Sequence, residues 1–152
     1  MIRLERDRTF WEDVARHPAV APSLGGFRPE LAAEVCRSPR ALPVASEHGG
    51  YIFIRLDAMG LVWELHSLFK PEGWGREALQ TGIAALGVLR SLNFQLITTL
   101  ELAANPRSRP PLSFGFRPAG DFRPSAAGST RLWALTRQGW EDSPAKRRHA
   151  CL

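Results

Sequence analysis

The sequence predicts one mixed α+β domain, and three observations lead to this fold class. Strand-like segments follow one another in the middle of the chain, separated by short glycine-containing links, as in an antiparallel meander. A long stretch from Arg76 has the apolar spacing of a helix, and a β-branched apolar run follows it. The 152 residues, 44% of them hydrophobic, are enough to bury one core.

The first third of the chain is expected to form a short strand at 2–5 and two helices. Asp7 or Thr9 can cap a helix that ends at Arg16, with Phe10 and Val14 on its buried side. The second helix is expected at 27–37, because Pro29 suits a helix start and Ser38-Pro39 ends the pattern.

Strands are expected at 41–47, 51–57 and 60–68, and the long helix follows from Arg76. The next strand, 95–100, reads QLITTL and is apolar on both faces, which suits a buried position. A strand, a helix of this length and a strand form one right-handed crossover, so 60–68 and 95–100 should run parallel. Strands at 120–123 and 130–136 complete the sheet, and a polar, basic tail follows.

Charge and cysteine content narrow the class of protein. The chain has 20 Lys and Arg against 15 Asp and Glu, a net charge of +5, which favours a phosphorylated cofactor, nucleic acid or an acidic protein surface as partner. The arginines are scattered without interleaved aromatic residues, which disfavours nucleic acid. Two cysteines, Cys36 and Cys151, form no disulfide framework, and no apolar run reaches the ~20 residues of a membrane span. A cytoplasmic protein is therefore expected.

The loop KPEGWG at 70–75 lies between a predicted strand and the predicted long helix. Glycine loops at helix N-termini bind anions, because unpaired N–H groups and the positive end of the helix dipole meet there. The same loop is equally compatible with a tight turn. The indole of Trp74, between two glycines, is expected to be exposed and to cover a ligand or a partner surface.

Three features follow one another along the chain: the 70–75 loop, Asn105 after the next strand, and Gly115-Phe116-Arg117 with Gly120. In these features and in their order, the chain resembles the GNAT superfamily of acyl-CoA-dependent N-acetyltransferases. The resemblance covers roughly residues 2–136, and the segment from His66 to Pro71-Glu72 is similar to GNAT-like proteins encoded by bacteriophages. It implies a mostly antiparallel sheet of about six to seven strands with one parallel, splayed pair and about four flanking helices. The domain would occupy 1–137, and the basic tail 138–152.

The resemblance also implies acetyl-CoA as acyl donor, with the pantetheine arm between the two parallel strands, and no metal. The implied cofactor-binding residues are Leu68, Phe69, Gly73, Trp74, Gly75, Arg76 and Asn105.

The loop departs from the family pattern, which starts with Arg or Gln. In one alignment, Lys70 stands where the family has Arg or Gln, and Gly73 and Gly75 match the glycine positions. In a second alignment, Trp74 stands at the arginine position, with Gly75 next and Ala78 downstream. The sequence does not distinguish the two alignments. Arg76 can reach a phosphate in either alignment, and is equally compatible with a solvated first-turn residue. An Asn-Pro turn is an equally simple explanation of Asn105.

Acetyl transfer to an amine requires removal of a proton from an ammonium whose pKa is near ~10.4. Glu64 and His66 are the candidate bases, because residues two apart on a strand share a face and this strand would border the acetyl group. The same spacing also fits a polar, solvated side of the sheet.

The tyrosine that serves the family as general acid has no counterpart. Its position is occupied by Pro111, and the chain's one tyrosine, Tyr51, lies in another predicted strand. Ser108 and Ser113 are nearby hydroxyls, for which a role in turns is the simpler interpretation. A thiol with a pKa near ~8.5 leaves tolerably as thiolate, whereas a positioned acid contributes about 10²–10⁴-fold.

Two hypotheses follow. The first is an N-acetyltransferase acting on an unidentified amine. The second is a GNAT-like module with little or no catalysis, for example a component of a phage particle found in the virion, which assembles as a homo-oligomer or larger complex through its C-terminal tail.

Overall fold

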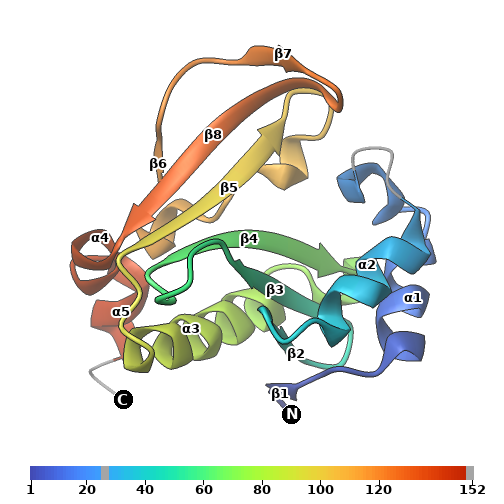
Figure 1. Cartoon of the computed structure of the whole chain (residues 1–152), viewed down its shortest axis with the longest axis horizontal. Helices are drawn as coiled ribbons and strands as arrows, with labels where there is room; N and C mark the ends of the chain where they lie inside the picture. Colours follow the sequence, from blue (N-terminus) through green and yellow to red (C-terminus); the bar gives the residue numbers. More distant parts are fainter. Residues whose placement is uncertain (25–27, 150–152) are drawn as a thin grey trace.

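The computed structural model describes residues 1–24 and 28–149, which form eight strands and five α-helices (Figure 1). The strands are β1 Arg3–Leu4, β2 Ala41–Ala45, β3 Gly49–Arg55, β4 Val62–Phe69, β5 Leu96–Leu102, β6 Arg117–Pro118, β7 Arg123–Ser125 and β8 Gly128–Thr136. The α-helices are α1 Arg8–Arg16, α2 Pro29–Arg37, α3 Arg76–Ser91, α4 Arg137–Glu141 and α5 Pro144–His149. Four 3₁₀ turns join them: η1 Ala21–Leu24, η2 Pro71–Gly73, η3 Pro106–Ser108 and η4 Leu112–Phe114.

The strands form one sheet in the order β1-β2-β3-β4-β5-β8-β6, with β7 also paired to β8. The meander of β2, β3 and β4 is antiparallel, and β4 and β5 are parallel neighbours, as the crossover through α3 predicts. The sheet is therefore mostly antiparallel with one parallel pair, which confirms the predicted mixed α+β class.

Helices α1 and α2 cover one face of the sheet. Asp7 caps α1 by accepting a hydrogen bond from the Thr9 amide at 2.9 Å, and Pro29 occupies the first turn of α2. The predicted start of the second helix at Phe27 lies outside the described residues. Trp11 is the largest buried side chain in a cluster of otherwise small and aliphatic residues, which include Cys36.

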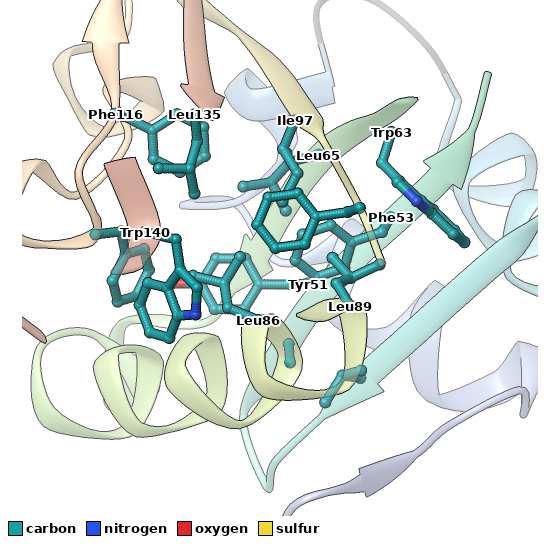
Figure 2. Packing of buried hydrophobic residues seen from close by; sticks show 14 of the residues in the cluster. Tyr51, Phe53, Trp63, Leu65, Leu86, Leu89, Ile97, Phe116, Leu135 and Trp140 are labelled. Atoms are coloured by element: carbon teal, nitrogen blue, oxygen red, sulfur yellow. The ribbon is translucent and has the colours of Figure 1, made fainter. Parts of the chain in front are cut away.

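Helix α3 covers the opposite face and packs on a larger, aromatic cluster (Figure 2). Tyr51, Phe53 and Leu65 from the sheet lie beside Leu86 and Leu89 of the helix. Because a Cβ on Gly82 would lie 2.4 Å from the Phe114 ring, glycine lets α3 approach this cluster closely.

The C-terminal segment differs from the predicted polar tail. Residues 137–149 form α4 and α5, and Trp140 and Ala145 are buried in the aromatic cluster. The Trp140 ring meets the Phe114 ring edge to face, with centroids 6.3 Å apart. Two apolar residues among many charged ones dock this segment on its own domain, a pattern that composition alone conceals. Residues 150–152, including Cys151, lie outside the described part of the chain.

The predicted strand at 120–123 is also wrong. The chain instead forms β7 at Arg123–Ser125, which pairs with β8 as a hairpin with Ala126 and Ala127 at its turn. Every residue of β7 is exposed, so no buried face sets its position in the sequence pattern.

Candidate active site

Strands β4 and β5 pair at one end and separate at the other. Their parallel ladder consists of three residue pairs and ends at Glu64 and Thr98, although β4 continues to Phe69 and β5 to Leu102 (Figure 1). Strand β5 remains paired with β8 along its whole length, so it moves away from β4 together with β8. The Thr99 hydroxyl donates to the Leu65 carbonyl at 2.8 Å across the start of the gap.

A cavity of about 340 Å³ lies at this gap. Its lining includes Glu64 and His66 from one face of β4 and Leu65 and Ser67 from the other. Consecutive residues of a strand point to opposite faces, so both sets reach one cavity because the edge of β4 is open here. Helix α2 and η1 complete the wall on the α1/α2 face.

Glu64 and His66 are brought together as predicted. His66 Nε2 lies 2.5 Å from Glu64 Oε1, and both side chains are partly exposed, 39% for Glu64 and 48% for His66. The hydrogen bond from His66 lowers the pKa of Glu64 against the opposing effect of burial. Glu64 is therefore ionised at neutral pH and can stabilise a protonated imidazole beside it.

Leu68 and Phe69 lie on the part of β4 that borders the gap. Leu68 lines the cavity and packs in the α1/α2 cluster, whereas Phe69 packs in the aromatic cluster. The Phe69 carbonyl accepts a hydrogen bond from the Trp74 indole at 3.1 Å. This hydrogen bond occupies the Phe69 carbonyl and joins the end of β4 to the 70–75 loop.

The glycines of the 70–75 loop have different structural roles. Gly73 is buried, and a Cβ there would lie 3.0 Å from the Phe69 ring and 3.1 Å from His48, so both side chains would have to shift slightly to admit it. Gly75 has φ +84°, a conformation that other residues rarely adopt, and a Cβ there would meet nothing within 4 Å. Lys70, which starts the loop in the first alignment, pairs with Asp13 of α1.

Two of the predicted amide donors are already used inside the loop. The Gly73 amide donates to the Lys70 carbonyl, and the Trp74 amide donates to the Pro71 carbonyl. By contrast, Gly75 caps α3 without a side-chain hydrogen bond, and the described residues supply no acceptor to the amides of residues 75–78. This leaves four N–H groups at the positive end of a 16-residue helix.

Trp74 is half-buried rather than exposed. Its indole packs against the aromatic cluster, and the Arg107 guanidinium lies 3.3 Å from the ring centroid. The stacking joins the 70–75 loop to η3, across the end of the gap. Arg76, in the first turn of α3, is exposed.

Asn105 is occupied by contacts within the protein. Its side-chain oxygen accepts from the Arg107 amide at 3.2 Å and caps η3, as the Asn-Pro turn predicts. Its Nδ2 donates to the Ser23 hydroxyl at 3.3 Å, which joins η3 to η1.

No tyrosine among the described residues reaches the site. Pro111 caps η4, and Tyr51 is 3% exposed in the aromatic cluster, where burial raises the pKa of its phenol far above the ordinary range. The Ser108 hydroxyl donates to the Asn105 carbonyl at 2.6 Å and accepts from the Leu102 amide at 2.6 Å, so it serves the turn.

A partly buried polar cluster, Ser46, His48 and Glu77, joins the turn before β3 to the first turn of α3. Glu77 accepts from the Ser46 hydroxyl at 2.6 Å and from the His48 amide at 2.9 Å, and its other oxygen lies 2.9 Å from His48 Nδ1. Although burial opposes ionisation, these hydrogen bonds lower the pKa of Glu77 to about 2. The hydrogen bond to Glu77 raises the pKa of His48.

Several residues of the site carry no functional signal in the sequence. Thr99 bridges the gap with its hydroxyl, but in the sequence it is one β-branched residue of a strand that was predicted to be buried. Leu31 and Val35 of α2 line the cavity, but their spacing in the sequence indicates only that this segment is a helix. The gap that brings them near β4 depends on the path of β5, and only the sheet topology shows it.

Metal-binding clusters and membrane-spanning helices are both absent from the described part of the chain. No group of three or more His, Cys, Asp or Glu side chains comes together in a way that can hold a metal ion. Within residues 1–24 and 28–149, no helix has the length and apolar character needed to cross a membrane.

Solved structures with the same arrangement are acetyltransferases. Spermidine N-acetyltransferase from Vibrio cholerae, in complex with CoA and spermine, has a TM-score of 0.71 at 15% identity over 93% of this chain and 98% of that one. Aminoglycoside 6'-acetyltransferase type Ii has a TM-score of 0.64 at 19% identity over 90% and 96%. A GNAT-family acetyltransferase from Bacillus anthracis has a TM-score of 0.65 at 15% identity over 90% and 94%.

No family model and no curated protein sequence matches the chain. The similarity therefore lies in the three-dimensional arrangement, which covers nine-tenths of the chain in each of these comparisons. The chain has the fold of the GNAT acetyltransferases.

Proposed function

We propose that the protein is an acyl-CoA-dependent N-acetyltransferase that transfers an acetyl group to an amine. The observation that carries the proposal is the cavity at the point where β4 and β5 separate, with Glu64 and His66 in its lining. The similar structures support it, since those of the spermidine and an aminoglycoside acetyltransferase contain CoA.

The cofactor fits two features of the described chain. The open edge of β4 provides backbone groups for the amides of a pantetheine arm, beginning at the Thr99 bridge. The four amides of residues 75–78 form a site for a diphosphate, because donors without acceptors gather at a helix N-terminus. When bound, acetyl-CoA supplies the acetyl group as a thioester.

His66 accepts the proton of the amine in this proposal. With Nε2 directed to Glu64, the neutral imidazole has Nδ1 as its acceptor, and Glu64 stabilises the imidazolium that forms. The neutral amine nitrogen would then form a bond to the acetyl carbon as the C–S bond breaks. The sulfur would depart as thiolate, consistent with a thiol pKa near ~8.5, and would take up the second N–H proton directly or through solvent.

An acyl-enzyme intermediate on Cys36, the cysteine within the described part of the chain, does not fit the structure. Cys36 is fully buried in the α1/α2 cluster, and burial raises the pKa of its thiol to about 12. Thiolate is the reactive form, so this thiol is inert. Direct transfer between the two bound ligands is the route that the described residues support.

Calorimetric titration with CoA tests the proposal. The protein should bind CoA with micromolar affinity, and Gly75→Glu should abolish binding, because it adds a carboxylate at the amides that receive the diphosphate. Gly75→Gln is the matched control and should retain binding, since it places a side chain of the same size on the same positive-φ backbone without the negative charge. If the unaltered protein bound no CoA at millimolar concentration, the enzyme proposal would fail and the non-catalytic interaction module would replace it.

A further inference from the structure

The cavity beside Glu64 and His66 has walls that do not suit a polycation. Its lining side chains include aliphatic residues of α2, β3 and β5 and the η1 residue Leu24: Leu24, Leu31, Val35, Ile52, Ile54 and Leu100. Two of them, Leu31 on α2 and Leu100 on β5, are 48% and 52% exposed, which is high for leucine side chains that face a cavity. The walls thus offer apolar surface that a ligand can cover.

Acidic groups are scarce in the same lining. Among the described residues that line the cavity, Glu64 carries the one carboxylate, and that carboxylate already pairs with His66. The remaining polar lining groups are serine and threonine hydroxyls, which carry no charge. The protein as a whole has a net charge of +5, so its overall field disfavours the approach of a polycation.

These two properties select the acceptor. A second or third ammonium group on one ligand would face aliphatic walls with no carboxylate to pair with, which is unfavourable. A single ammonium has its place beside Glu64 and His66, and an apolar body can cover Leu31 and Leu100. On the basis of the proposed function, we propose that the acceptor is a small primary amine with one positive charge and an apolar body about the size of an aromatic ring.

The size of the cavity agrees with this class. At about 340 Å³ it lies at the lower end of the range of small-molecule sites, roughly 300–1,000 Å³. Such a volume holds a ring with a short aliphatic amine together with the reactive end of the donor. The spermidine and aminoglycoside acetyltransferases share the fold, and the acceptors in their names carry several amino groups.

A thiol-release assay with acetyl-CoA and a panel of amines tests the inference. Phenethylamine should exceed ethylamine in kcat/KM by roughly 10–100-fold, because the two share the amine and differ in the ring that covers the walls. Spermidine should be acetylated at least about tenfold less efficiently than phenethylamine. Equal rates for phenethylamine and ethylamine, or a preference for spermidine, would overturn the inference. Faster acetylation of the hexapeptide Leu-Ser-Gly-Ser-Gly-Ser would overturn it in favour of a peptide acceptor.

A charge added to the wall sharpens the test. Leu31→Glu should shift the ratio of kcat/KM between phenethylamine and spermidine by roughly tenfold toward spermidine, since the wall then holds a second carboxylate. Val88→Glu is the matched control on α3, where a 40% exposed apolar side chain lies outside the cavity lining. An equal shift in both variants would show that overall charge, not the cavity wall, sets the preference and would refute the inference.

The inference and the proposed function fail in different ways. Calorimetric titration with phenethylamine measures acceptor binding without turnover, and CoA titration measures cofactor binding without an acceptor. If the protein bound CoA and acetylated only spermidine, the proposed acetyltransferase activity would stand and the inference of an apolar acceptor would be wrong. The opposite result would be a protein that binds phenethylamine but not CoA, with phenethylamine binding lost in Leu31→Glu and kept in Val88→Glu. It would support the apolar amine site and contradict the proposed acetyltransferase activity.

Discussion

The two faces of the central sheet are packed in different ways. The α3 face is filled by large rings, among them Phe53, Phe114, Trp133 and Trp140. The α1/α2 face is built on smaller residues around Trp11, and it retains the cavity at the gap between β4 and β5. Complete filling stabilises one face, and incomplete filling of the other leaves room for a ligand. The comparison predicts that changes on the two faces affect different properties.

The largest effect is expected for the chemistry on the cavity face. In His66→Gln, kcat for amine acetylation should fall by about 10²–10⁴-fold, because the group that accepts the amine's proton is lost. Its stability in urea should stay within about 0.5 kcal/mol of the parent, since the side chain is partly exposed. His149→Gln, a change of an exposed histidine on α5, is the control and should alter neither. Unchanged kcat in His66→Gln would remove His66 from the mechanism.

The next effect concerns stability on the α3 face. Trp140→Ala should reduce the free energy of unfolding by about 3–5 kcal/mol, because it deletes a ring buried against Phe114. Val35→Ala at the cavity wall should cost about 1 kcal/mol or less, since that side chain is only half-buried. Urea unfolding measures both. Similar losses in the two variants would contradict the contrast between the faces.

Two glycines of α3 provide a finer test of the same packing. Gly82→Ala should destabilise the protein by about 1–3 kcal/mol, because the new Cβ would overlap the Phe114 ring, which Tyr51 and Trp140 hold in place. Gly87→Ala should stabilise it by about 0.4–1 kcal/mol, since the added methyl group meets nothing and alanine favours the helix. Thermal unfolding of the pair gives opposite signs; a gain in both would show that Phe114 has room to move.

The smallest effect is a pH dependence in the cluster of Ser46, His48 and Glu77. The raised pKa of His48 means that its contribution to stability is complete below about pH 6.5 and is lost as the pH rises through the folded-state value. The contribution of Glu77 is complete above about pH 4.3 and is lost as the pH falls toward its folded-state pKa of about 2. The cluster therefore stabilises most between roughly pH 4.3 and 6.5.

Substitution of the histidine isolates the alkaline side of this dependence. His48→Gln should flatten the decline of Tm between about pH 6.5 and 8.5, by no more than about 2 °C, because the ion pair is partly exposed. The His149→Gln control should keep the parent profile. An unchanged profile in His48→Gln would show that the imidazole stays neutral in the folded protein.

The sequence was informative where periodic patterns and local signals agreed. The cap at Asp7, the meander and the crossover through α3 all follow from short-range chemistry. The C-terminal helices were missed, because one buried Trp140 among many charged residues gives no helical period. Strand β7 was misplaced by three residues at its start, because an exposed hairpin has no buried face to set its register.

The candidate site was predictable to a similar extent. Glu64 and His66 meet because a strand places residues two apart on one face, and that rule needs no tertiary information. The gap at Thr99 and the cavity walls from α2 depend on contacts between distant segments, which no local pattern contains. For the same reason, the loop amides of Gly73 and Trp74 could not be known to be occupied.

The gap between β4 and β5 is an opening in a sheet that otherwise separates two packed layers. Residues from both faces of β4 line this cavity, so a ligand held in it touches side chains that an unbroken sheet would keep apart. In the proposed acetyl transfer, donor and amine would meet at this opening, which suits a ternary complex rather than a covalent enzyme intermediate.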